Sequence, residues 1–257
     1  MTAVTATEAV SDTLTMIRRS LRHTVRTPDA LLMAAVLPVL LMLLFVYVFG
    51  GAIETGTEYV DYVVPGIILL CTGYGAASTA VAVAADLAEG IIDRFRSLPI
   101  LSSAVLTGHV VASLARNAFS TARVVGVAVL SGFRPTAGPL EWLAVAGVLL
   151  LFVLAMSWLA VALGLLARSV EGASGFTFFV LFLPYLSSAF VPTGTMPGVL
   201  RAIADHQPVT PIIETLRGLL LGTPIGSSGW LAVVWCGGLL VVSYALSSAL
   251  FRRRTAR

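Results

Sequence analysis

Long apolar segments recur along the chain and are separated by shorter stretches that contain the charged residues. A transmembrane helix needs about 20 consecutive apolar residues. Most of these segments hold no charge, but the third one is interrupted by Arg116 and Arg123. The pattern predicts an all-α integral membrane protein in which one transmembrane domain covers residues 1–257 and crosses the bilayer six times. The predicted spans are about 29–50, 62–86, 104–133, 140–167, 173–191 and 229–251.

Composition and charge agree with a membrane environment. The sequence is 58% hydrophobic and 11% charged, whereas soluble domains carry about 25% charged residues. Its sixteen basic residues are all arginines, and eleven lie in the two tails and the even-numbered connections against three in the odd-numbered ones. This bias places both termini in the cytoplasm and the chain in the plasma membrane. The placement of the arginines follows the membrane, so the net charge of +3 does not indicate nucleic-acid binding.

A short amphipathic helix is predicted before the first span, over about 13–26. Leu14, Ile17, Leu21 and Val25 recur at helical spacing, and arginines form the neighbouring stripe. Long arginine stems reach apolar surface while their heads stay in the headgroup layer. The segment is either a basic juxtamembrane anchor or an elbow helix that lies in the cytoplasmic interface and braces the bundle.

The second connection contains a segment with one apolar and one charged side. Residues 87–98 read LAEGIIDRFRSL and are followed by Pro99, which ends a helix. A defined amphipathic helix in a short cytoplasmic loop is a surface that rests on lipid or docks into another protein. Spacing alone leaves both interpretations open.

The fifth connection is apolar but rich in proline. It predicts a short helix that ends around Asp205 to Gln207 and a second helix that starts at Thr210 and Pro211. In the second helix Glu214 and Arg217 are paired at i,i+3, and Gly222 is the predicted C-cap. Two such broken helices re-enter the outer leaflet only where protein shields their ends. The alternative is an external cap without a role in transport.

One face of the third predicted span is polar. An arginine at the centre of a bilayer costs at least ~2.5 kcal/mol when it faces lipid, so this stripe is expected to face protein or water. Its side chains either bond to neighbouring helices or line the path of a transported molecule. The stripe consists of His109, Ser113, Arg116, Asn117, Ser120 and Arg123.

Three features together resemble a known family. They are LAEGIIDRFRSLPI at 87–100, FVPTGTMPGVLRAIADHQPVTPIIETLRGLLLG at 190–222, and an elbow helix followed by six spans. The chain resembles the ABC type-2 transporter permeases, and within them the daunorubicin/doxorubicin-resistance type. The resemblance implies export of a hydrophobic or amphipathic small molecule by two facing permeases, a second copy of this chain or a related one, powered by two separate cytoplasmic ATPases. The same fold also serves exporters of lipids or glycolipids.

The resemblance also implies roles for particular residues. The loop at 87–98 would be a coupling helix seated in the ATPase, with a second docking point at 168–171, and the fifth connection would form an external gate. The implied coupling residues are Glu89, Gly90, Asp93, Arg94, Phe95, Arg96, Leu98, Pro99, Arg168 and Glu171. The implied gate residues are Pro192, Met196, Pro208, Pro211, Glu214 and Arg217.

The chain contains no lysine and therefore no GxxxxGK[ST] phosphate loop. ATP and Mg²⁺ are thus expected on the partner ATPase, and no cofactor, catalytic site or metal site is expected in this chain, since His23, His109 and His206 lie in separate regions. An ion-coupled carrier would need carboxylates inside the membrane. All thirteen acidic residues fall in tails, loops or span ends, which argues against that alternative. A membrane assembly protein is the remaining alternative function.

Overall fold

The computed structural model describes residues 28–53, 55–90, 102–167 and 169–255, and all regular structure in this part of the chain is helical. The elbow helix expected at 13–26 lies outside the described residues. The elements in chain order are α2 (Pro28–Leu44), the π-helix η1 (Phe45–Phe49), α3 (Tyr59–Ala88), α5 (Ser102–Leu130), α6 (Pro139–Leu166), α7 (Val170–Phe182), the 3-10 helices η2 (Leu183–Leu186) and η3 (Thr193–Thr195), α8 (Gly198–His206), α9 (Val209–Leu221) and α10 (Ser228–Thr255).

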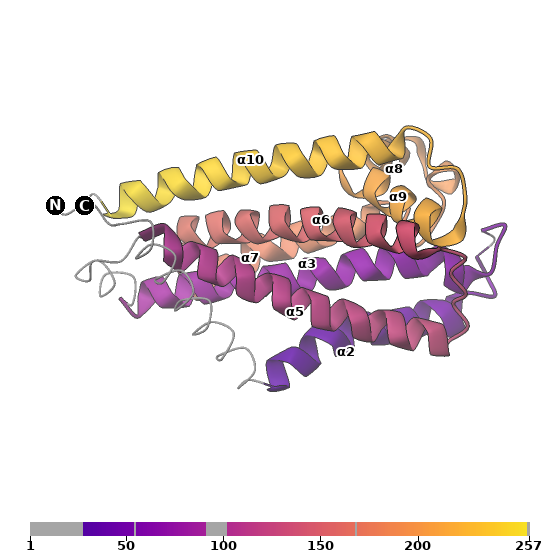
Figure 1. Cartoon of the computed structure of the whole chain (residues 1–257), viewed down its shortest axis with the longest axis horizontal. Helices are drawn as coiled ribbons and strands as arrows, with labels where there is room; N and C mark the ends of the chain where they lie inside the picture. The colour runs from indigo at the N-terminus through magenta and orange to yellow at the C-terminus, as the bar shows by residue number, and fades with distance from the viewer. Residues whose placement is uncertain (1–27, 54, 91–101, 168, 256–257) are drawn as a thin grey trace.

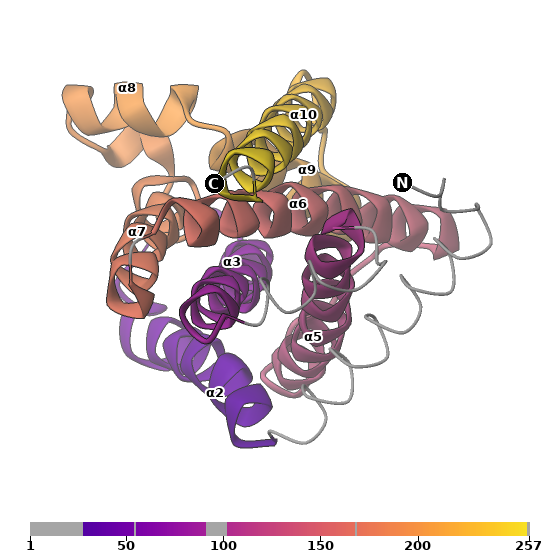
Figure 2. The ribbon, with the colours of Figure 1, turned by 90° about the vertical axis from the view of Figure 1, so that its left-hand side faces the viewer.

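The long helices run roughly along one axis, and α8 and α9 gather at one end of the bundle (Figure 1). Helix α3 is the central element, surrounded by α2, α5, α6 and α7, while α10 packs on the other side of α6 (Figure 2). Helix α3 is apolar all round, as expected of a helix enclosed by others. From Val63 to Cys71 all its side chains are buried.

The outermost helices keep large apolar side chains exposed. Phe178 and Phe179 on α7 are 64% and 76% exposed, and Val241 on α10 is 69% exposed. In water such faces promote association, whereas in a bilayer they contact lipid tails. In the part of the chain that the structure describes, three helical stretches are long and apolar enough to cross a membrane: Tyr59–Ala88, Pro139–Leu166 and Ser228–Arg253. The fold is therefore that of an all-helical membrane protein.

The fifth apolar helix is shorter than the sequence predicts. The predicted span 173–191 is wrong at its C-terminal end, because α7 stops at Phe182 and continues as the 3-10 turn η2. Pro184 lies inside this turn and has no backbone N–H to continue an α-helix. The chain from 187 to 190 then forms turns without regular structure.

The amphipathic segment of the second connection begins differently from the prediction. Leu87 and Ala88 are the last residues of α3, with Glu89 as its C-cap. Gly90 then takes a φ of +67°, the left-handed conformation that commonly ends a helix. A single uninterrupted helix over 87–98 is therefore wrong in its first turn, and residues 91–101 lie outside the described part of the chain.

The two short helices of the fifth connection are confirmed with one change. Helix α8 ends at His206 and Gly222 ends α9 with a φ of +70°, as predicted. Helix α9 nevertheless begins at Val209, so the predicted cap at Thr210 is wrong. The Thr210 hydroxyl instead donates to the carbonyl of Ala204, 2.6 Å away, which links the ends of α8 and α9.

Candidate functional site

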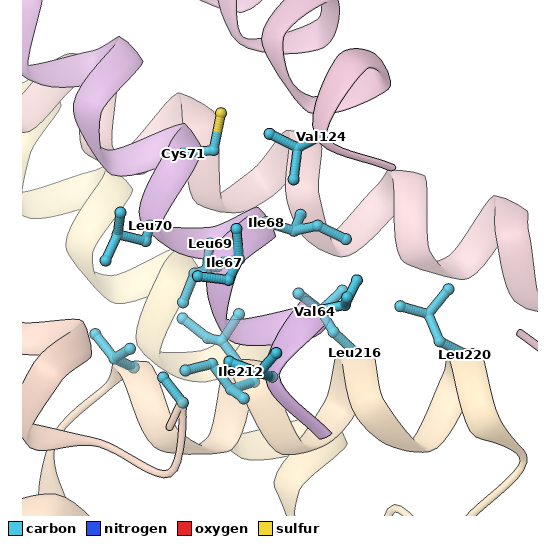
Figure 3. Packing of buried hydrophobic residues seen from close by; sticks show 14 of the residues in the cluster. Val64, Ile67, Ile68, Leu69, Leu70, Cys71, Val124, Ile212, Leu216 and Leu220 are labelled. Atoms are coloured by element: carbon cyan, nitrogen blue, oxygen red, sulfur yellow. The ribbon is translucent and has the colours of Figure 1, made fainter. Parts of the chain in front are cut away.

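Helix α9 is anchored against the first half of α3. Ile212, Leu216 and Leu220 lie on the face of α9 that packs toward Val64 and its neighbours on α3 (Figure 3). These three leucine and isoleucine side chains are at most 1% exposed. Between helices of a membrane protein such packing stabilises through van der Waals contact. Helix α9 is thus packed into the bundle, whereas most residues of α8 are exposed.

Arg217 of α9 ties three segments together. Its side chain is buried, and its Nη2 donates to the carbonyls of Tyr62, at 3.1 Å, and Ser188, at 2.8 Å. Its Nη1 donates to Glu214 Oε1 at 2.7 Å, and the guanidinium lies 3.8 Å from the centre of the Tyr62 ring. We call Tyr62, Ser188, Glu214 and Arg217 the Arg217 cluster. A planar guanidinium suits this set, because it offers several donors in one plane and stacks on an aromatic ring.

Three carbonyl groups of the segment 183–190 accept hydrogen bonds from side chains elsewhere in the chain, and one of them is the carbonyl of Ser188 described above. Gln207 donates to the carbonyl of Leu186, and the Tyr59 hydroxyl donates to the carbonyl of Phe190 at 2.9 Å. Gly66 makes the approach possible, since a Cβ there would lie 2.6 Å from the Cβ of Ala189. Broken backbone at membrane depth is tolerated only where protein shields it, and this segment meets that condition.

The other predicted gate residues occupy the same end of the bundle. Pro192 and Met196 flank η3, and Pro208 precedes α9, while Pro211 is buried in the first turn of α9. The structure brings Glu214 and Arg217 into one cluster with α3. Pro192, Met196, Pro208 and Pro211 take no part in the hydrogen bonds that hold that cluster.

The polar stripe of α5 faces α3 and α6. Its first residue, His109, places Nε2 3.1 Å from Asp86 Oδ2 near the end of α3. Farther along, Arg116 Nη2 donates to Thr79 Oγ1 of α3 at 3.0 Å. These contacts join the part of α3 that precedes the second connection to the part of α5 that follows it.

The centre of the stripe is buried between three helices. Ser157 Oγ of α6 donates to Ser113 Oγ at 2.8 Å, and Asn117 Nδ2 donates to the Ser113 carbonyl at 3.0 Å. Ser120 is also buried, whereas Arg123 lies 4.0 Å from the centre of the Phe119 ring near the outer face. Of the two interpretations of the stripe, helix packing accounts for His109, Ser113 and Arg116.

Three of the predicted ATPase contacts lie among the described residues at the opposite end of the bundle: Glu89, Gly90 and Glu171. Glu89 follows α3, and Glu171 lies exposed in the first turn of α7. Hydrogen bonds from its own backbone N–H and from the Ser169 hydroxyl lower the pKa of Glu171, so it is charged at neutral pH. The remaining predicted contacts, Asp93, Arg94, Phe95, Arg96, Leu98, Pro99 and Arg168, lie outside the described residues.

Comparison with known proteins decides the family. Residues 11–221 match the family described as ABC-2 type transporter. The chain is 32% identical to the daunorubicin resistance ABC transporter permease protein DrrB1 of Streptomyces coeruleorubidus over 250 residues, 96% of this chain and 88% of that protein. It is 27% identical to the probable doxorubicin resistance ABC transporter permease protein DrrC of Mycobacterium tuberculosis (strain CDC 1551 / Oshkosh) over 249 residues, 95% of this chain and 89% of the relative.

The chain belongs to the ABC-2 type transporter family. The resemblance inferred from 87–100 and 190–222 is thereby confirmed. The segment 87–100 and residues 190–221 lie within the matched region, as do the Arg217 cluster and the polar stripe of α5. The family assignment thus covers every predicted site in this ABC-2 protein.

Several residues of the ABC-2 bundle were not identified from the sequence as site residues. Tyr59 and Tyr62 of α3 form hydrogen bonds with Phe190 and Arg217. Thr79 of α3 and Ser157 of α6 form hydrogen bonds with the α5 stripe. Their partners lie 37 to 155 positions away, so no local spacing indicates them. The signal available in the sequence was the presence of two tyrosines one turn apart at the start of an apolar helix.

Proposed function

We propose that the chain is the membrane-spanning permease of an ATP-driven exporter that moves a hydrophobic or amphipathic, drug-like small molecule out of the cell. The observation that carries this proposal is similarity over at least 95% of the chain to permeases named for resistance to daunorubicin and doxorubicin. The apolar outer faces of α7 and α10 support a membrane location. A lipid or glycolipid exporter is the alternative.

The proposal includes the six-span topology with both termini in the cytoplasm. Helices α2, α3, α5, α6, α7 and α10 overlap the six predicted spans, although α7 ends at Phe182, before the end of its predicted span. The C-terminal ends of α3 and α10 lie at one end of the bundle, and α8 and α9 lie at the other (Figure 1). This arrangement agrees with a cytoplasmic location of the arginines at 252–254 and with an external location of the fifth connection.

ATP and Mg²⁺ would be bound by a separate ABC ATPase, and a second copy of this chain or a related permease would complete the exporter. The coupling element would be the loop that begins at Glu89 and ends before α5. Helices α3 and α5 carry the two ends of this loop, and the contact between Asp86 and His109 joins them close to it. A movement of the ATPase that displaces the loop would therefore displace α3 and α5 together.

The fifth connection would act as the external gate. Arg217 holds α9 to α3 and to the irregular segment after α7, so these three elements would move as one unit. The carbonyl groups of Leu186, Ser188 and Phe190 in that segment accept hydrogen bonds from protein side chains, which supports a position beside a pathway. The α5 stripe enters the proposal as packing between helices.

The coupling element is tested by placing proline in it. Ile92→Pro should break the segment, so that the ATPase no longer co-purifies or hydrolyses ATP without export. Ile92→Ala is the matched control, since alanine shortens the side chain but keeps the helix. Charge reversal at Glu89 or Asp93 should weaken ATPase association as well. An Ile92→Pro variant that binds the ATPase and exports at the original rate would refute this role of the loop.

A further inference from the structure

We infer that a pocket between α5, α6 and α10 binds the headgroup of an anionic phospholipid, in the leaflet that meets the C-terminal end of α10. The pocket has a volume of about 290 Å³. The residues that supply its polar and aromatic groups are Thr107 on α5, Trp158 on α6, and Tyr244, Ser248 and Arg252 on α10. The inference goes beyond the proposed function, because it does not depend on which molecule is exported.

The walls of the pocket are held in place by contacts between the helices. Ser247 Oγ of α10 donates to the Trp158 carbonyl of α6 at 3.1 Å. The Trp158 ring meets the Tyr244 ring edge-on, with 4.8 Å between the ring centroids. Leu106 and Phe251, which also line the pocket, are 3% and 6% exposed and belong to one apolar cluster. A ligand would therefore meet a cavity that already exists.

The lining changes from aromatic to charged along α10. Tyr244, Ser248 and Arg252 are spaced four residues apart, so they lie on one face of the helix. At a rise of 1.5 Å per residue, Arg252 lies about 12 Å nearer to the end of the helix than Tyr244. A phospholipid has the same order, with acyl chains first, then ester groups and then the phosphate. The match places the phosphate at Arg252 and the start of the acyl chains at Tyr244 and Trp158, in the layer where such rings are enriched.

The charge of the lining favours an anion. The guanidinium of Arg252 carries several N–H donors that suit phosphate oxygens, and the hydroxyls of Thr107 and Ser248 can donate as well. The sequence of α10 contains no acidic residue. A larger cavity of about 820 Å³ between α5 and α6 has, by contrast, no charged residue among the described residues that line it. Basic pockets between transmembrane helices on the cytoplasmic side bind anionic headgroups.

Size and position favour a lipid over a transported drug and over a docked protein. The volume lies at the lower limit of the 300–1,000 Å³ or so that is typical of drug-sized ligands, so it suits a headgroup better. Tyr244 is 52% exposed, and the nearby Val241 and Val242 are 69% and 64% exposed, which leaves an apolar flank for acyl chains. A protein docked on the end of the bundle would cover Arg252 but not Tyr244, about two turns away.

The test is a titration of the purified chain in detergent with phosphatidylglycerol, in which bound lipid is counted by native mass spectrometry. Phosphatidylcholine with the same acyl chains is the zwitterionic comparison and should bind more weakly. Arg252→Ala should raise the Kd for phosphatidylglycerol about fivefold or more, the factor that one arginine contributes next to an anionic lipid. The matched control is Arg253→Ala, which removes the same charge from a neighbouring exposed position outside the pocket lining and should leave the Kd nearly unchanged.

A second variant fills the pocket and keeps every arginine. Ser248→Phe places a ring in the cavity and should raise the Kd for phosphatidylglycerol in the same direction as Arg252→Ala. Ala245→Phe is its control, because this position is exposed on the same helix and lies outside the lining. It should leave the Kd unchanged.

The outcomes separate this site from other ligands and from the proposed function. Equal losses of affinity in Arg252→Ala and Arg253→Ala would show only a general attraction to basic surface and overturn the inference. An unchanged Kd in both Arg252→Ala and Ser248→Phe, or equal Kd values for the two lipids, overturns it as well. Competition by inorganic phosphate would assign the pocket to a free anion instead of a lipid. None of these results changes drug export, which is measured separately by uptake into vesicles.

Discussion

At the scale of single residues, Arg217 joins three segments at the end of the bundle where α8 and α9 lie. Arg217→Ala would leave the carbonyls of Tyr62 and Ser188 without their donor. Loss of one partner from a buried charged cluster costs about 3–5 kcal/mol, so we expect a marked drop in the thermal unfolding midpoint of the purified protein. Arg217→Lys should recover only part of it, because an ammonium cannot make the same planar set of bonds.

Arg201 provides the control for that measurement. It pairs with Asp205 at 3.5 Å on the exposed surface of α8, and its side chain is 57% exposed. Exposed pairs contribute about 0–1 kcal/mol, so Arg201→Ala should change the midpoint little. Equal destabilisation by the two substitutions would show that the Arg217 cluster has no special structural role.

Arg116 is the residue whose role the sequence left open. Its contact with Thr79 indicates packing between α5 and α3. Arg116→Ala should therefore lower the yield of folded protein, measured by size-exclusion chromatography in detergent, whichever substrate is later tested. Normal yield combined with an altered preference among exported compounds would instead assign Arg116 to the pathway.

The sequence supported only part of this residue-level account. The pairing of Glu214 with Arg217 follows from their i,i+3 spacing and is confirmed at 2.7 Å. The stacking of Arg217 on Tyr62 and its bond to Ser188 do not follow from any spacing, because the partners come from α3 and from an irregular segment. Contacts of this kind depend on how helices are arranged, which apolar periodicity does not encode.

At the scale of elements, the junction between α3 and α5 makes a testable contribution to coupling. Asp86→Asn removes the charge that faces His109 without changing the length of either helix. Substitutions along a coupling route change coupling by about 0.5–2 kcal/mol. We therefore expect less transport per ATP hydrolysed in vesicles, with normal co-purification of the ATPase.

Asp205→Asn is a suitable comparison, since it removes a carboxylate from an exposed pair at the other end of the molecule. It should leave the ratio of transport to hydrolysis unchanged. If Asp86→Asn also leaves that ratio unchanged, the Asp86–His109 contact only stabilises the fold.

Helix boundaries were predictable where proline or glycine sets them. Gly222 ends α9, and α8 spans nearly the residues expected from its apolar spacing. The prediction failed at Pro184 and Gly90, where apolar periodicity continues through a break in the backbone. Periodicity reports which face is apolar, whereas the dihedral angles at these two residues decide whether the helix continues.

At the scale of the whole molecule, the topology is tested by labelling introduced cysteines in intact cells with a membrane-impermeant maleimide. Gly194→Cys, exposed in η3, should react from outside, and Arg253→Cys, exposed near the end of α10, should react only after the membrane is opened. The native Cys71 and Cys236 are buried and provide a low background. Labelling of Arg253→Cys in intact cells would contradict the proposed orientation.

The central claim is that ATP hydrolysis by a partner drives export through this chain. The most direct measurement is uptake of daunorubicin into inside-out membrane vesicles from cells with the gene intact and from cells in which it is deleted. The account predicts uptake that requires both ATP and this chain and that persists when an uncoupler removes the proton gradient. Uptake that proceeds without ATP and disappears with the uncoupler would contradict it and would identify an ion-coupled carrier.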